Sequence, residues 1–137
     1  IARLHEVVGD RYYSSTEFTP AKENFEKAFS ILEKLSSEEK NKNNTFYKSI
    51  LSKKTETDTI GKRFVDNKIK SLCDTSLAQY GYYTSIRRSR KEEAETALNL
   101  SRSLLSDADS ILKKEKIYTT PQLQAYYDKT KREVNQE

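Results

Sequence analysis

The sequence contains little of what breaks helices, binds metals or forms crosslinks. Three glycines and two prolines in 137 residues leave few turn positions, which is typical of a chain made mostly of helices. Cys73 is the one cysteine, so an internal disulfide framework is excluded. Together with the one histidine, His5, it is too little for a zinc site of the usual Cys/His kind. We therefore expect no metal, no cofactor and no small-molecule ligand.

Long apolar runs are absent as well. No segment approaches the roughly 20 apolar residues of a membrane span, and no signal-peptide pattern opens the chain. Because the first residue is Ile1 rather than Met, we expect the sequence to be part of a longer protein, which leaves an upstream signal, lipid anchor or domain open. Hydrophobic residues make up only 34% of the chain, so their spacing decides whether a core forms.

The spacing of apolar residues predicts a helical hairpin over residues 1–40. The two stripes, with steps of three to four residues, are Leu4, Val7, Val8, Tyr12 and Tyr13, then Ala21, Phe25, Ala28, Phe29, Leu32 and Leu35. Thr19 followed by Pro20 predicts the start of the second helix, because a hydroxyl caps the first turn and proline loses no hydrogen bond there. The polar run 36–44 predicts a frayed helix end and a loop.

Residues 45–116 are predicted to form a long helical hairpin region. Apolar residues indicate a short helix over 46–51, and the run 55–59 is predicted to interrupt it, because threonine and aspartate side chains compete for backbone hydrogen bonds. Two longer apolar stripes follow, over residues 60–86 and 94–112. We expect the two stripes to pack against each other in antiparallel directions.

The last segment opens with Thr120 and Pro121, a second pair of the kind that starts helices. It predicts a short C-terminal helix over residues 120–137 that frays near Glu137. The length of the chain suits a small domain, so we expect residues 1–137 to form a single helical domain.

Small and aromatic residues also fall at fixed offsets in residues 2–33. They are Val8, Gly9, Tyr12, Phe18, Ala21, Phe25 and Ala28. This pattern resembles the tetratricopeptide (TPR) repeat, a pair of helices of about 34 residues. The resemblance implies that Gly9 and Ala21 let the two helices approach closely. His5 and Glu33 stand where the family has a bulky residue and a proline, so we expect one repeat capped by an atypical helical hairpin.

In TPR proteins the inner face of the first helix holds the partner. By position, the resemblance implies that Arg3, Glu6, Asp10 and Tyr13 are partner-binding residues. Family members that clamp a C-terminal carboxylate have Lys and Asn where this chain has Glu6 and Asp10, so the resemblance implies a basic or amide-rich partner. The alternative is that each of these side chains is an ordinary solvated helix residue.

Tyrosine is abundant, with nine residues in the chain. Adjacent pairs occur at Tyr12 and Tyr13, at Tyr82 and Tyr83, and at Tyr126 and Tyr127. Neighbouring residues on a helix point about 100° apart, so we expect one ring of each pair to reach the surface. Tyrosine is enriched at protein interfaces. Rings at the margin of the core explain the pairs equally well.

The densest basic cluster is Arg87, Arg88, Arg90 and Lys91. It suits the phosphates of anionic lipid or nucleic acid. We rank a structural interpretation first, in which the cluster lies at a helix C-terminus and Glu92, Glu93 and Glu95 begin the next helix, because each charge then complements a helix dipole. The overall charge of +4 is spread along the chain, which disfavours nucleic acid and leaves a membrane surface open.

Candidates for catalysis are few. The clustered carboxylates, Glu92, Glu93, Glu95, Asp107 and Asp109, are expected to be solvated, whereas a general acid needs burial or a close partner. His5 has no evident nucleophile beside it. Cys73 lies on an apolar stripe, where a small buried hydrophobe is more common than a reactive thiolate. We therefore predict that the chain is not an enzyme.

The sequence thus predicts a protein–protein interaction module that binds and stabilises a partner, with phosphate binding at the basic cluster as the alternative. Its richness in lysine, serine and asparagine is typical of an AT-rich bacterial genome. In this respect the chain is similar to envelope-associated TPR-like proteins of spirochaetes. That similarity implies a bacterial envelope or periplasmic location and a role in membrane-protein complexes or infection.

Overall fold

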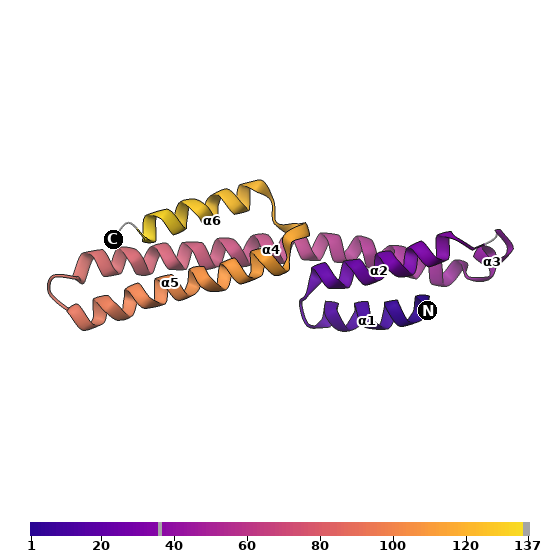
Figure 1. Ribbon diagram of the computed structural model, residues 1–137, viewed down its shortest axis with the longest axis horizontal. Helices are drawn as coiled ribbons and strands as arrows, with labels where there is room; N and C mark the ends of the chain where they lie inside the picture. The colour runs from indigo at the N-terminus through magenta and orange to yellow at the C-terminus, as the bar shows by residue number, and fades with distance from the viewer. Residues whose placement is uncertain (36, 136–137) are drawn as a thin grey trace. The chain divides into compact units, whose positions relative to one another are not determined.

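The computed structural model describes residues 1–35 and 37–135, and every regular element within these ranges is a helix (Figure 1). The predicted all-α class is therefore confirmed. The chain divides into two compact units, Ile1–Arg63 and Phe64–Glu137, which are described in turn. Helix α4 (Asn44–Ile86) contributes its first part to one unit and its second part to the other. The single domain expected over residues 1–137 stays a prediction.

In the first unit, α1 (Ala2–Ser14) and α2 (Phe18–Glu33) form the predicted helical hairpin. The predicted cap at Thr19 is wrong, because α2 begins at Phe18 with Glu17 at the N-cap position. Pro20 still lies in the first turn, where backbone N–H groups have no partner within the helix, so proline is tolerated there.

The stretch predicted as a loop contains a short helix, α3 (Ser37–Lys42). Acidic residues lie in its first turn and basic residues in its last, an order that complements the helix dipole. The prediction of a loop is therefore wrong over these six residues. Ser36, where the predicted loop began, lies outside the described residues.

Close packing of α1 on α2 depends on Gly9. A Cβ atom at Gly9 would lie 2.6 Å from Cε1 of Phe25, far inside van der Waals contact. Phe25 is 1% exposed, and Ala21 is fully buried beside it on α2. The close approach that the sequence predicted at Gly9 and Ala21 is therefore what the structure has. Ala28, Leu32 and Ile50 continue this core toward the first turns of α4.

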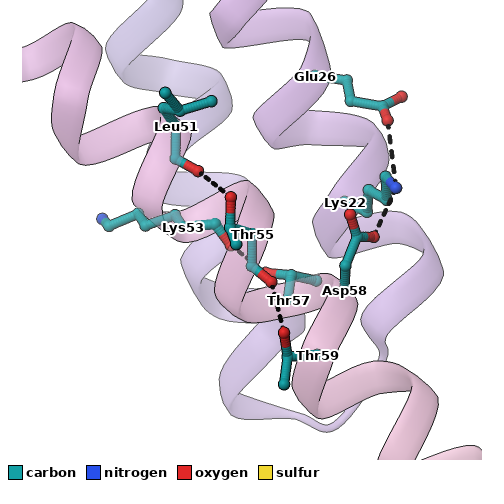
Figure 2. A network of polar contacts seen from close by, with 8 residues as sticks. All are labelled: Lys22, Glu26, Leu51, Lys53, Thr55, Thr57, Asp58 and Thr59. Carbon is teal, nitrogen blue, oxygen red and sulfur yellow. Dashed lines mark hydrogen bonds and ion pairs between the residues drawn. The ribbon is translucent and has the colours of Figure 1, made fainter.

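Helix α4 is continuous through residues 55–59, so the predicted interruption there is wrong. Figure 2 shows the reason: each threonine hydroxyl donates to the carbonyl four residues earlier, Thr55 to Leu51 at 3.1 Å, Thr57 to Lys53 at 2.6 Å and Thr59 to Thr55 at 3.1 Å. The hydroxyls thus bond within the helix instead of competing with it. Asp58 pairs with Lys22 of α2, which holds the same segment to the hairpin (Figure 2).

The second unit is built on the rest of α4 and on α5 (Lys91–Lys114), which returns along it (Figure 1). Ser76 of α4 and Ser101 of α5 are fully buried and bonded to each other. Small residues of α5, among them Ala94, Ala97 and Ala108, are buried along the helix. The predicted antiparallel hairpin is confirmed for this part of the chain.

After a short 3-10 helix, η1 (Lys116–Tyr118), the chain ends in α6 (Pro121–Val134). Thr120 caps α6, because its side chain accepts a hydrogen bond from the Leu123 backbone N–H at 3.1 Å. The predicted start at Thr120 and Pro121 is confirmed. Glu137, where fraying was predicted, lies outside the described residues.

Candidate functional site

The four residues implied by the TPR resemblance lie along one side of α1, and each contacts α4. The Arg3 guanidinium carbon lies 4.6 Å from the centre of the Phe46 ring. Glu6 and Asp10 each place an oxygen 3.0 Å from Lys53 Nζ. The Tyr13 hydroxyl donates to Glu56 Oε1 at 3.2 Å. The structure therefore brings these residues together, with the first turns of α4 lying against them.

Lys53 is the centre of this contact. Burial lowers the pKa of its ammonium group, but hydrogen bonds and charge attraction from Asp10 and Glu6 outweigh burial and raise the pKa above its ordinary value. The lysine therefore stays charged and neutralises one of the two negative charges, on Glu6 and Asp10, that were predicted to attract a basic partner. Arg3 is exposed and Tyr13 half-buried, so part of this face still reaches solvent.

The hollows beside this face are small or polar. One of about 140 Å³ lies between Asp10, Tyr13, Lys53 and Glu56, with Phe25 at its floor. Another, of about 320 Å³, is lined mostly by polar side chains, among them Arg3, Glu6, Lys42, Asn43, Thr45 and Ser49. These two hollows thus offer contacts to a polar partner and little apolar area on which a partner could anchor.

The basic cluster lies where α4 gives way to α5. Arg87, Arg88 and Arg90 form the connection, and Lys91 is the first residue of α5. Glu92 and Glu93 follow in the first turn of α5, as the helix-dipole interpretation predicted, but Lys91 begins the same helix, where a cation opposes the dipole, so the interpretation is wrong for Lys91. Arg90 Nη1 lies 3.4 Å from Glu93 Oε2.

A groove of about 460 Å³ lies on one flank of this hairpin end. It is lined by Tyr83, Arg87, Arg88, Lys91, Ala94, Glu95 and Leu98, and we call it the basic groove. The four basic residues, Arg87, Arg88, Arg90 and Lys91, are all exposed. Glu95 is the one carboxylate in its lining.

A second groove, of about 410 Å³, is lined by Gln79, Tyr82, Glu92, Glu93, Thr96, Ala97 and Leu100, and we call it the acidic groove. Tyr82 is 43% exposed and Leu100 45% exposed, high values for such side chains. The Tyr82 hydroxyl donates to Glu93 Oε2 at 3.1 Å. Leu100 was not identified from the sequence as a surface residue. The available signal was that Leu100 lies off the apolar stripe through Ala97 and Ser101, which predicts an exposed side chain.

The tyrosine pairs differ in their surroundings. Tyr82 is exposed and Tyr83 half-buried, whereas Tyr127 is buried and Tyr126 half-buried. Tyr12 and Tyr13 are both half-buried. Of these three pairs, only Tyr82 and Tyr83 include an exposed ring, that of Tyr82, beside a groove.

The side chains of Cys73 and His5 are each bonded to a neighbouring residue of the fold. Burial raises the pKa of the Cys73 thiol, against the opposing effect of a hydrogen bond with Thr130. His5 Nδ1 lies 3.3 Å from Asn24 Oδ1. Within residues 1–35 and 37–135, no cluster of His, Cys, Asp and Glu has the arrangement of a metal site. The helices described in these ranges include none with the length and apolar character to cross a membrane.

Comparison of the chain with protein-family models, with curated proteins and with solved structures found no match. The resemblance of residues 2–33 to a TPR repeat therefore stays a prediction. Any assignment of function rests on the grooves and charges described above.

Proposed function

We propose that this chain is a non-enzymatic protein-binding module that acts through the closed end of the α4–α5 hairpin. The observation that carries the proposal is the acidic groove, in which Tyr82 and Leu100 stand about half exposed beside two carboxylates. A tyrosine ring and a neighbouring aliphatic side chain, rimmed by polar groups, are typical of the centre of a protein interface.

The α1 face is the weaker candidate for the same function. Glu6 and Asp10 already share Lys53, so a basic partner gains less from them than from carboxylates without a cation. Arg3 and Tyr13 also have partners on α4. We propose that these four residues first hold the unit together and contact a partner only at their exposed edges.

The basic groove supports a second candidate function, binding of phosphate groups on anionic lipid or nucleic acid. Arg87, Arg88 and Lys91 converge on one hollow, an arrangement that suits phosphate oxygens. Glu95 lies in the same hollow, and Glu92 and Glu93 lie on the other flank of the hairpin end. Because an extended anionic surface would also meet these carboxylates, we rank phosphate binding second.

The proposal is tested by crosslinking from the groove itself. A photoreactive phenylalanine analogue at position 82 is expected to crosslink a protein in the native lysate, and a second substitution, Leu100→Ser, is expected to reduce the yield severalfold. The matched control carries the analogue at position 117, because Ile117 is 47% exposed and lies outside the groove. Equal crosslinking from both positions would contradict a binding role for the acidic groove.

Salt separates the two candidate functions. Binding to vesicles of anionic lipid that falls steeply with ionic strength, and disappears on charge reversal at Arg87, Arg88, Arg90 and Lys91, would favour the phosphate function. Protein binding that resists salt and is lost with Tyr82→Ala would favour the interface.

A further inference from the structure

The two grooves occupy opposite flanks of one hairpin end. On α5, residues 91, 94, 95 and 98 line the basic groove, while residues 92, 93, 96, 97 and 100 line the acidic groove. On α4, the adjacent residues Tyr82 and Tyr83 face different grooves. The closed end of the α4–α5 hairpin therefore presents basic side chains and Tyr83 on one flank. It presents acidic side chains and Tyr82 on the other.

Part of this charge is not neutralised within the chain. In the part of the chain that the structure describes, Arg88, Lys91 and Glu92 have no ion pair. Glu93 differs, because it accepts from both Tyr82 and Arg90. The basic flank thus keeps two cations available and the acidic flank keeps a carboxylate beside the exposed Tyr82 and Leu100.

A partner on either flank must carry the opposite charge, and this chain carries both signs at the same hairpin end. We propose that the occupant of the acidic groove is the basic connection, Arg87–Lys91, of a second copy of this chain. The inference rests on the proposed function, since it names a partner for the same groove. Because the two flanks face opposite ways, the contact is head to tail: the basic flank of one copy lies on the acidic flank of the next, and further copies can add at both ends.

The chemistry of these side chains suits the contact. The apolar stems of Arg88 and Lys91 cover the exposed faces of Tyr82 and Leu100, while their charged ends reach Glu92. A cation above the Tyr82 ring adds attraction. The net charge of +4 is small, so long-range repulsion between copies is weak beside these local pairs. Each contact is small and polar, and the association is therefore reversible.

Sedimentation analysis of the 137-residue chain over a wide range of concentration tests the inference. We expect reversible association into dimers and longer chains, with a dissociation constant for each contact that rises about tenfold or more between low and high salt. A chain that stays monomeric at millimolar concentration and low salt would overturn the inference. Crosslinking from position 82 to a different protein would then still support the proposed function, so the two failures are distinguishable.

Charge exchange tests which flanks join the copies. One variant combines Glu92→Lys with Glu93→Lys, and the other combines Arg88→Glu with Lys91→Glu. Each variant alone is expected to lose self-association, because its two flanks then carry the same sign. An equimolar mixture is expected to associate again, because the basic flanks of one variant then meet the acidic flanks of the other.

The matched control, Lys129→Glu with Lys131→Glu, reverses two exposed charges on α6 and is expected to leave self-association unchanged. Circular dichroism of each variant establishes that the helices are retained. Self-association that persists in both charge variants would overturn the inference, since another surface would then join the copies. Failure of the folded variants to associate on mixing would overturn it as well.

Discussion

The hydroxyl groups of Ser76 and Ser101 each donate a hydrogen bond to the other's backbone carbonyl, at 2.8 Å and 2.7 Å. Both residues are fully buried where α4 meets α5. A hydroxyl has one proton, so the pair forms two reciprocal bonds, and each joins one helix to the other. This contact fixes the register of the hairpin that carries both grooves.

Substitution of either serine should therefore weaken the fold. Ser76→Ala and Ser101→Ala are each expected to lower the free energy of unfolding by about 0.5–1 kcal/mol. This is the net stabilisation from one buried hydrogen bond, reduced by the gain in helix propensity that alanine brings. Urea denaturation measures the change. Ser103→Ala, an exposed position on α5, is the control and is expected to be neutral or slightly stabilising.

Gly9 of α1 and Gly81 of α4 should respond oppositely to alanine. Gly9→Ala is expected to destabilise by about 1–2 kcal/mol, because the new methyl group collides with the buried Phe25 ring. Gly81 has no atom within 4 Å of an added Cβ, so Gly81→Ala is expected to stabilise α4 by about 0.5–1 kcal/mol. Thermal denaturation distinguishes the signs, and a stabilising Gly9→Ala would contradict the close contact.

Local signals in the sequence predicted much of this fold. Gly9 and Ala21 indicated close helix packing, Thr120 and Pro121 marked a helix start, and apolar spacing gave the α4–α5 hairpin. Thr19 failed as a cap because the helix begins one residue earlier, at Phe18. The predicted break at residues 55–59 was wrong because a threonine hydroxyl has two common bonding modes. It can cap a helix end, or it can donate to the carbonyl four residues earlier within a helix, and the residue type alone does not decide which occurs.

Alanine at the exposed threonines tests that correction. In a continuous helix, Thr55→Ala and Thr59→Ala are each expected to stabilise by about 0.5 kcal/mol, because alanine has the higher helix propensity. At a helix cap the same changes would destabilise by about 1 kcal/mol. Thr57→Ala is expected to have the opposite effect, because Thr57 is fully buried. This substitution is expected to lower the free energy of unfolding by about 1–2 kcal/mol.

The candidate site was less predictable, because it depends on contacts between residues far apart in the chain. Position on α1 indicated that Glu6 and Asp10 share a face, but nothing local indicated that Lys53 lies between them. The acidic groove likewise needs Tyr82 and Leu100 from two helices. Sequence periodicity predicts which face of a helix is polar, and it does not predict which cation neutralises that face.

Double-mutant cycles measure how firmly Lys53 holds α1. The coupling of Lys53 with Glu6 is expected to exceed its coupling with Asp10, because the Glu6 side chain is 16% exposed and that of Asp10 is 48% exposed. Both energies should fall at about 0.2–1 kcal/mol and shrink in high salt. Alanine variants unfolded in urea provide the values, and zero coupling for both pairs would contradict the ion pairs.

Tyr126 provides a test of the second unit by pH. Its hydroxyl donates to Asp74 of α4, and this bond, with burial and the nearby negative charge, raises the pKa of Tyr126 from 10.0 to about 12. The folded state thus favours the protonated phenol. Its contribution to stability is complete below pH 10 and is lost as the pH rises toward 12, where the unfolded chain ionises first.

Urea denaturation across this range should therefore show a steeper loss of stability in the native chain than in Tyr126→Phe, which has no proton to lose. Absorbance of phenolate should also show one tyrosine that ionises near pH 12 in the native chain and is missing from the variant. Tyr82→Phe is the matched control, because its exposed ring lies on the same unit and it leaves Asp74 and Tyr126 in place. Parallel pH profiles for native chain and Tyr126→Phe would show that the bond to Asp74 does not hold α6 on α4 in solution.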